Sequence, residues 1–268
     1  MSGPAFITGG SSGIGLELAR ALAKRGHPIA LFARNAGRLQ DAVRVLKAEI
    51  PDAMILAFPA DVGDRAQITT AVQTAISQLG APAWAIANAG LAEPGAFLTQ
   101  PLEAHEAQMQ TNYMGALYFA HAVAPAMAAQ DGNPGGKLVF VSSGAAFFGI
   151  YGYSAYAPSK FALRGLAEVL RVELKPHDIS VTLAYPPDTQ TPMLAAEEAS
   201  KPAVTKEITA SGGVWSAADV AQLIVKRAAK GRFTVAPGAQ MRALLALHSI
   251  LAPALRFWQG TIVRKHTR

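Results

Sequence analysis

Three tyrosines lie in the segment from Tyr151 to Lys160, and one of them is placed to do acid–base chemistry. Tyr156 is followed four residues later by Lys160, and residues at this spacing share a face of a helix. An unperturbed phenol has a pKa of about 10, and a neighbouring ammonium favours its ionised form. The pair is therefore a candidate proton donor with its modulator. Pro158 is tolerated only in a first turn, so we expect the helix to begin close to Tyr156.

A glycine-rich turn near the N-terminus could hold a phosphate group. Residues 8–15 have the sequence Thr-Gly-Gly-Ser-Ser-Gly-Ile-Gly and separate an apolar run from an amphipathic one. Glycines let the chain turn sharply and bring backbone N–H groups and a helix N-terminus against a pyrophosphate. An ordinary strand-to-helix loop is the alternative. The candidate contacts are Gly9, Ser11, Ser12, Gly13, Ile14 and Gly15.

The end of the second apolar run, Ala33-Arg34, bears on which dinucleotide is bound. An NAD site usually carries a carboxylate here for the adenosine 2′-hydroxyl, whereas a guanidinium suits a 2′-phosphate. The sequence therefore favours NADPH/NADP, with Arg34 as the main contact. Arg38 is a candidate second contact, and a solvent-exposed helix face is an equal alternative for it.

Strands and helices must position these residues, and the pattern of apolar residues predicts both. Short apolar runs predict strands at residues 5–8, 28–33, 54–58, 83–87, 137–141 and 180–184. Amphipathic runs predict helices at 14–25, 38–49, 68–79, 103–127 and 159–173. This alternation implies right-handed crossovers, hence an α/β fold with a doubly wound parallel sheet of the Rossmann type. We expect a single catalytic domain over residues 1–238 and a helical, apolar and basic extension over 239–268. Residues 186–213 are expected to be the most mobile segment.

Composition narrows the class of protein. The chain has 268 residues, of which 51% are hydrophobic and 16% charged, enough for a core and too apolar for disorder. Cysteine is absent and no two histidines lie three or four residues apart, so we expect neither disulfides nor a metal site. The sequence has no recognisable signal peptide and no apolar run of about 18 residues, which predicts a cytoplasmic protein. The net charge of +6 has no accompanying nucleic-acid motif, so no nucleic-acid partner is expected.

Over about residues 3–235 these motifs together resemble the short-chain dehydrogenase/reductase family. The glycine-rich turn, Asn88-Ala89-Gly90, a serine after the fifth strand and the Tyr156–Lys160 pair occur in the family's order. The family's usual spacing between serine and tyrosine selects Ser143 over Ser142. The resemblance implies that Tyr156 donates a proton to a substrate carbonyl while Ser143 hydrogen-bonds its oxygen. Lys160 would lower the tyrosine pKa and hold the nicotinamide ribose.

The resemblance also assigns supporting residues. Asn112 matches the asparagine that anchors a water in the proton relay, although a buried helix asparagine of structural use is the alternative. Residues 88–90 would stabilise the central sheet and border the adenosine. Pro187 replaces a glycine that usually follows the sixth strand, which departs from the family pattern. The remaining cofactor contacts implied are Asp61, Val62, Pro186 and Thr191.

Three stretches resemble one group within the family, the 3-ketodihydrosphingosine reductases of sphingolipid synthesis. They are residues 139–143, 159–168 and 181–189, and the last ends in an unusual Tyr-Pro-Pro-Asp-Thr run. Those enzymes reduce a long-chain 2-amino-3-ketone with NADPH, so the resemblance implies this reaction here. Reduction of another hydrophobic ketone is one alternative, and a non-catalytic NADPH-binding protein is a second. An intact set of Asn112, Ser143, Tyr156 and Lys160 argues against the non-catalytic alternative.

The C-terminal stretch from Gln240 onward is apolar, edged with arginine and interrupted by Pro253. Basic apolar segments can lie at an anionic membrane surface, so a peripheral contact with the inner face of a membrane is one expectation. A helix packed on the core or on another subunit is an equal alternative. The family resemblance implies a homo-oligomer.

Overall fold

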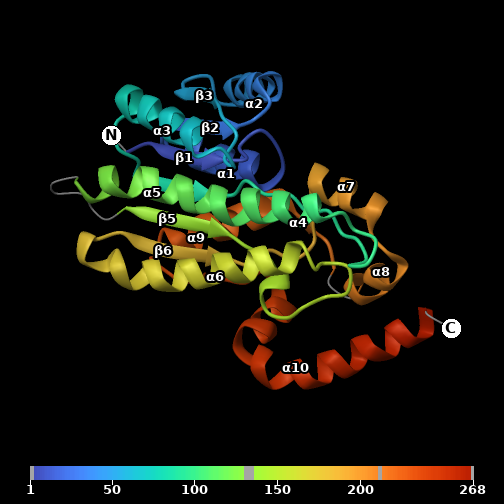
Figure 1. Cartoon of the computed structure of the whole chain (residues 1–268). Helices are drawn as coiled ribbons and strands as arrows, with labels where there is room; N and C mark the ends of the chain where they lie inside the picture. The colour runs from blue at the N-terminus through green and yellow to red at the C-terminus, as the bar shows by residue number, and fades with distance from the viewer. Residues whose placement is uncertain (1–2, 130–135, 211–212, 267–268) are drawn as a thin grey trace.

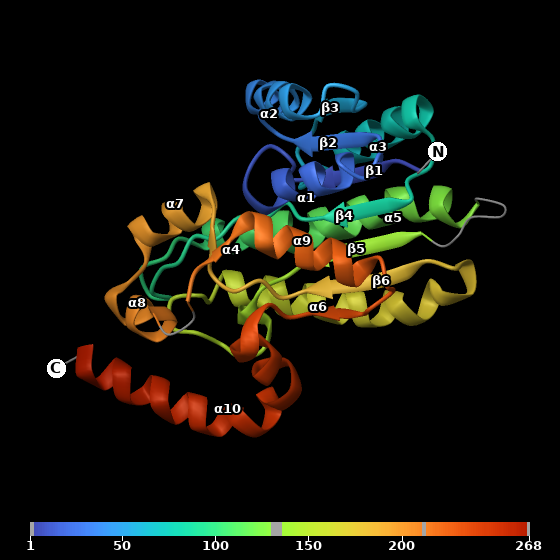
Figure 2. The ribbon, with the colours of Figure 1, turned by 180° about the vertical axis from the view of Figure 1, so that it is seen from behind.

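The short apolar runs form the strands of one parallel sheet, and helices cover both of its faces (Figures 1 and 2). The structure is a computed structural model that describes residues 3–129, 136–210 and 213–266. The strand order is β3-β2-β1-β4-β5-β6-β9, all parallel, which confirms the predicted doubly wound α/β fold. The strands are β1 (Ala5–Thr8), β2 (Ile29–Ala33), β3 (Ile55–Pro59), β4 (Trp84–Ala87), β5 (Lys137–Val141), β6 (Ser180–Ala184) and β9 (Thr234–Val235).

Two hydrophobic clusters, one on each side of the sheet, hold the layers together. On one side Val72, Phe119 and Leu163 belong to a cluster fed by α3 (Arg65–Leu79), α5 (Gly115–Ala128) and α6 (Tyr156–Glu173). On the other side the helices are α1 (Gly13–Ala23), α2 (Ala36–Glu49) and α9 (Ala217–Ala228), with Leu18 and Val220 fully buried. Because both faces are covered, β1 and β4 are buried along their whole length.

Half of the predicted boundaries shift by one to three residues, and side-chain caps explain two of the shifts. Helix α3 begins three residues earlier than predicted because Asp64 accepts hydrogen bonds from the N–H groups of Ala66 and Gln67. Helix α2 begins two residues earlier than predicted because Asn35 accepts from the N–H of Arg38. The predicted helix at 103–127 is interrupted. It consists of α4 (Leu102–Met109), a π-helical turn η1 (Gln110–Met114) and α5.

Two short helices fill much of the segment expected to be mobile. They are α7 (Pro192–Ser200) and α8 (Ala203–Thr209), and the two-residue strands β7 (Thr189–Gln190) and β8 (Trp215–Ser216) pair beside them. Residues 211–212 of that segment lie outside the described residues. Figure 1 places both helices beyond the carboxyl-end edge of the sheet.

The C-terminal extension is one long helix, α10 (Gly238–His266), with Pro253 inside it. Its first turns bury Met241 and Leu244 against the core, and near its end Ile262 packs with Val204 and Ile208 of α8. Between these anchors the helix runs along the outside of the body, as Figure 2 shows. The predicted extension also includes residues 267–268, which lie outside the described residues. The division into a catalytic domain and an extension stays a prediction.

Among the described residues, none of the helices combines the length and the apolar character of a membrane span.

Candidate active site

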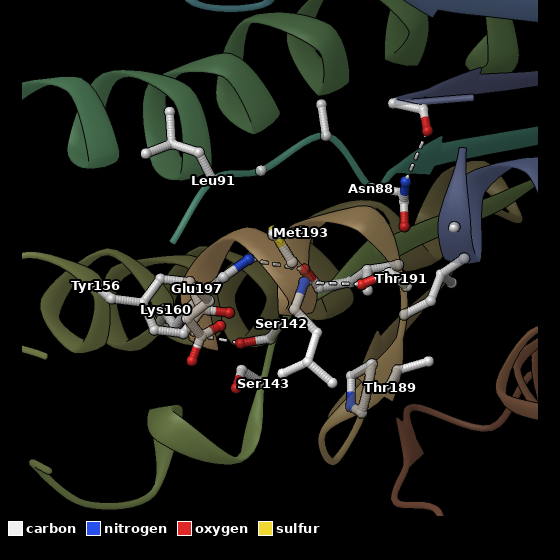
Figure 3. Close-up of a pocket in the computed structure, with 18 of the residues that line it drawn as sticks. Asn88, Leu91, Ser142, Ser143, Tyr156, Lys160, Thr189, Thr191, Met193 and Glu197 are labelled. Carbon is white, nitrogen blue, oxygen red and sulfur yellow. Dashed lines mark hydrogen bonds between the residues drawn. The ribbon is translucent and has the colours of Figure 1, made fainter. Parts of the chain in front are cut away.

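A pocket of about 410 Å³ opens where the carboxyl ends of the parallel strands meet α7 and the start of α10. In an open α/β sheet this edge is where ligands bind. Figure 3 shows Tyr156, Lys160 and Glu197 gathered toward one side of the pocket, and Asn88 toward the other. Nearly all of the residues singled out from the sequence line it.

The glycine-rich turn forms the floor at the end of β1. Gly9 and Gly13 have φ angles of 65° and 54°, in the left-handed region that favours glycine. A Cβ on Gly15 would lie 2.2 Å from the carbonyl oxygen of Gly9, so the start of α1 packs directly on the turn. A Cβ on Gly13 would lie 2.8 Å from the Thr191 side chain. The turn therefore leaves room for a ligand only because these positions lack side chains.

Asn88 and Thr8 lock this turn to the end of β4. The Asn88 side-chain amide donates to the carbonyl oxygens of Thr8 (3.1 Å) and Gly9 (3.3 Å). The Thr8 hydroxyl accepts from the backbone N–H groups of Asn88 (3.0 Å) and Ala89 (3.1 Å). These bonds fix the position of residues 88–90 along the pocket wall.

Arg34 stands at the end of β2, as the sequence indicated, and Arg38 lies on the first turn of α2. Both line the pocket together with Asp61 and Val62. The Arg34 side chain is 67% exposed, and its Nη1 lies 3.8 Å from Asp61 Oδ2. An exposed pair at this distance contributes little to stability. The guanidinium groups are thus open to an anionic ligand.

Tyr156 and Lys160 lie together on the first turns of α6. They are 8% and 4% exposed, and the Lys160 ammonium lies 5.5 Å from the centre of the Tyr156 ring. Lys160 Nζ donates to the carbonyl oxygen of Val141 at the end of β5 (3.2 Å). Burial lowers the pKa of Lys160 to about 8. Lys160 is therefore held at the end of β5. It loses its positive charge at a pH only slightly above neutral.

The pKa of Tyr156 is raised above its ordinary value, which is opposite to the direction expected from Lys160. Burial is the largest cause, and the negative charge on Glu197 adds to it. A hydrogen bond with Ser143 acts in the opposite direction and favours the ionised phenol. Burial and the neighbouring carboxylates thus outweigh the Ser143 hydrogen bond in setting the pKa of Tyr156.

The two candidate serines have different surroundings. The Ser143 side chain lines the pocket and hydrogen-bonds the Tyr156 side chain. Ser142 also lines the pocket, but it is buried and its hydroxyl donates to the carbonyl oxygen of Lys160 (3.4 Å). This arrangement supports Ser143 as the serine that faces a substrate.

Asn112 and Gly15 fall outside the pocket lining among the described residues. Asn112 is fully buried in the π-helical turn η1. Its amide donates to Leu91 O (3.0 Å) and Ser159 Oγ (2.9 Å), and its oxygen accepts from Leu91 N (2.8 Å). These bonds join η1 to α6 and to the chain after β4. They favour the structural alternative for Asn112, and its role in a water relay stays a prediction.

A buried ionic cluster on α7 forms part of the wall beside Tyr156 and was not identified from the sequence. The Tyr153 hydroxyl donates to Glu197, and the ammonium of Lys201 lies 3.2 Å from Glu197 and 3.7 Å from Asp188. The only sequence signal was the four-residue spacing of Glu197 and Lys201 within a segment expected to be mobile.

Part of the pocket lining is apolar. It includes residues from the loop after β5, from α8 and from the first turns of α10. The sequence placed α10 outside the catalytic domain, so its contribution to the pocket is a second feature that the sequence did not predict. The apolar lining residues here are Phe148, Ile150, Ile208, Met241 and Leu244.

Known proteins are similar to this chain in sequence and in fold. The sequence model of the short chain dehydrogenase family matches residues 4–202. The chain belongs to the short-chain dehydrogenase/reductase family. Short-chain dehydrogenases and reductases are oxidoreductases, and this chain is an enzyme of that class.

Several curated members of the family are similar over nearly the whole chain. A 3-dehydrosphinganine reductase of Danio rerio is 39% identical over 95% of this chain and 76% of its own. A 3-ketodihydrosphingosine reductase of Bos taurus is 38% identical with the same coverage. Among solved structures, a short-chain dehydrogenase from Sphingobium yanoikuyae in complex with NADPH is 26% identical, with a TM-score of 0.79 over 95% of both chains.

Proposed function

We propose that this enzyme reduces the ketone of 3-ketodihydrosphingosine, a long-chain 2-amino-3-ketone, to the secondary alcohol with NADPH. One observation carries the proposal. One pocket is lined by the glycine-rich turn, by Tyr156 and Ser143, and by the apolar side chains of Phe148, Ile150, Ile208, Met241 and Leu244. The relatives named above, at 38–39% identity, support the same substrate.

The pocket fits a nicotinamide dinucleotide. The glycine-rich turn and the N-terminus of α1 leave a cradle that a Cβ would fill, and backbone N–H groups at such a terminus suit a pyrophosphate. Arg34 and Arg38 would hold a 2′-phosphate. Asp61, Val62 and residues 88–90 would border the adenosine, and Lys160, Pro186 and Thr191 would border the nicotinamide end. When bound, NADPH supplies the hydride that the carbonyl carbon accepts.

Tyr156 supplies the proton, and the side chains around it assist. The phenol donates it to the carbonyl oxygen, and the Ser143 hydroxyl, which hydrogen-bonds Tyr156, holds that oxygen in place. A positively charged Lys160 would stabilise the phenolate that remains. The carbonyl carbon thus gains a hydride and its oxygen gains the tyrosine proton, which yields the alcohol.

The experiment that tests the proposal is NADPH oxidation with 3-ketodihydrosphingosine beside a panel of simple ketones. We expect the amino ketone to have the highest kcat/KM. A higher kcat/KM for an unrelated hydrophobic ketone would favour the alternative substrate class. Tight NADPH binding with no oxidation on any ketone would instead favour a non-catalytic NADPH-binding protein.

A further inference from the structure

We infer that Glu197 binds the ammonium group of an amino ketone substrate and so selects amino ketones over plain ketones. The inference rests on the proposed function, because it concerns the group that lies next to the reacting carbonyl. It adds a specificity-determining residue outside the predicted tyrosine, lysine and serine set.

Glu197 has the position that such a contact needs. It lines the same pocket as Tyr156 and Ser143 and is only 7% exposed. Its partner Tyr153 has a ring centre 5.5 Å from that of Tyr156. Figure 3 shows Glu197 drawn beside Tyr156 in the pocket wall. In a 2-amino-3-ketone the nitrogen is bonded to the carbon next to the carbonyl, so it must lie within a few ångströms of the Tyr156 hydroxyl during reduction.

The charge in this part of the wall also suits a cation. Asp188, Glu197 and Glu198 all lie within 4 Å of one ammonium, that of Lys201. Three carboxylates against one fully buried lysine leave an excess of negative charge in this part of the wall. Burial raises the pKa of Glu197 and of Asp188, which reflects the free energy needed to keep these carboxylates ionised. An α-amino group has a pKa of about 7.7 to 8.0 and is positively charged near neutral pH, so a bound substrate amine would offset this excess.

The same contact would couple recognition to proton donation. The charge on Glu197 raises the pKa of Tyr156, which makes the phenol a weaker acid. An ammonium held between the two groups would oppose that effect, because a nearby positive charge favours the phenolate. A ketone without the amine would leave the tyrosine under the full influence of the carboxylate. The amino ketone should therefore gain in turnover as well as in binding.

The hydrogen bond from Tyr153 gives Glu197 a fixed orientation. Tyr153 lies before α6 and Glu197 lies on α7, so the bond joins two separate elements at the pocket wall. Lys201 approaches the same carboxylate from the end of α7. A purely structural tie between α7 and the segment before α6 is the competing explanation, and it predicts no preference for amines.

The test compares two ketones that differ only in the amine, 3-ketodihydrosphingosine and 1-hydroxyoctadecan-3-one. The measured quantity is the ratio of their kcat/KM values with NADPH. We expect the wild type to prefer the amino ketone, and Glu197→Gln, which keeps an acceptor for Tyr153 but removes the charge, to lower that ratio about tenfold or more. Tyr153→Phe should lower it in the same direction.

Glu168→Gln is the matched control, because it removes the same charge on α6 outside the pocket, where the side chain is 50% exposed and pairs with Arg164. It should keep the wild-type ratio. The inference would be overturned if Glu197→Gln lowered kcat/KM equally on both ketones, or if the wild type used both ketones equally well. Either result would leave the proposed reduction intact. A wild type that does not reduce the amino ketone at all would overturn the proposed function and the inference with it.

Discussion

Tyr156 is the residue on which the proposed chemistry depends most. Its ring packs against Tyr153 and lies over Lys160, and neither contact involves the hydroxyl group. Replacing it by phenylalanine therefore removes the proton donor and leaves the packing. We expect Tyr156→Phe to retain a few per cent of kcat or less while its dissociation constant for NADPH, measured by fluorescence titration, stays within about twofold of the wild type. A variant that keeps substantial turnover would assign the proton to another group.

The predicted preference for NADPH over NADH depends on Arg34. Ala33 offers no carboxylate for a ribose 2′-hydroxyl, and the exposed Arg34 guanidinium suits a phosphate. The double substitution Ala33→Asp with Arg34→Ala should shift the ratio of kcat/KM for NADPH to that for NADH by about tenfold or more toward NADH. Arg171→Ala, an arginine on α6 whose side chain stacks on Phe233 outside the pocket, is the control and should leave the ratio unchanged. Equal use of both cofactors by the wild type would contradict this role for Arg34.

The turn between β1 and α1 depends on glycine at position 15. A Cβ there would lie 2.2 Å from Gly9 O and 2.6 Å from Asn88 Nδ2, so backbone atoms must move to admit it. We expect Gly15→Ala to lower the free energy of unfolding by about 1–3 kcal/mol and to weaken NADPH binding. Thermal unfolding and a binding titration on the same sample measure both effects.

Gly165 provides the control for that substitution. It lies within α6, where a Cβ would meet no heavy atom of the described chain within 4 Å. Gly165→Ala should therefore stabilise the protein by about 0.5–1 kcal/mol, because alanine is the better helix former. If Gly15→Ala behaved like Gly165→Ala, the close packing of α1 on the turn would be wrong.

The elements that sequence patterns predicted well are those with a strong local signal. β5 and β6 have the predicted bounds because each is a mostly apolar run in which every residue after the first is buried. The pair Tyr156 and Lys160 was found because both residues lie on one helix and their spacing fixes a shared face. Glu197 was missed because its partner, Tyr153, is 44 residues away, and no local pattern records which distant residues a fold brings together.

Helix α10 carries an exposed apolar face. The sequence suggested an apolar, basic extension. In the structure the helix is held at both ends, and between them Leu255 packs against the core and Gln259 hydrogen-bonds the backbone of Gly149 and Tyr151. Leu247, Ile250 and Phe257 recur at spacings of three and seven residues and so lie on one helix face. Ile250 and Phe257 are 76% and 72% exposed. Arg242, Arg256 and Arg264 lie on the same helix, and no acidic residue follows Asp219.

An apolar face edged by arginine fits an anionic membrane surface, where a long-chain ketone also accumulates. We expect the double substitution Ile250→Ser with Phe257→Ser to reduce binding to anionic vesicles severalfold. Raising the salt should weaken wild-type binding, since charges on a surface are screened over about 8 to 10 Å near physiological ionic strength. Sedimentation with vesicles measures both effects.

The control for the membrane experiment removes apolar area elsewhere. Val45→Ser with Met54→Ser changes two residues that are 44% and 51% exposed on the opposite part of the molecule, and it should leave vesicle binding unchanged. Light scattering on the same samples gives the number of subunits. A change from oligomer to monomer in the α10 variant, without any change in vesicle binding, would identify this face as a subunit contact.

The most direct test of the whole account is to follow a labelled hydride into the product. The enzyme would be incubated with 3-ketodihydrosphingosine and NADPH that carries deuterium at the transferred position of C4, and the product analysed by mass spectrometry. We predict dihydrosphingosine with one deuterium, at C3, formed by the wild type and, at no more than a few per cent of that rate, by Tyr156→Phe. Failure to form dihydrosphingosine, or formation of product without deuterium, would contradict the proposal that this protein reduces the amino ketone with NADPH.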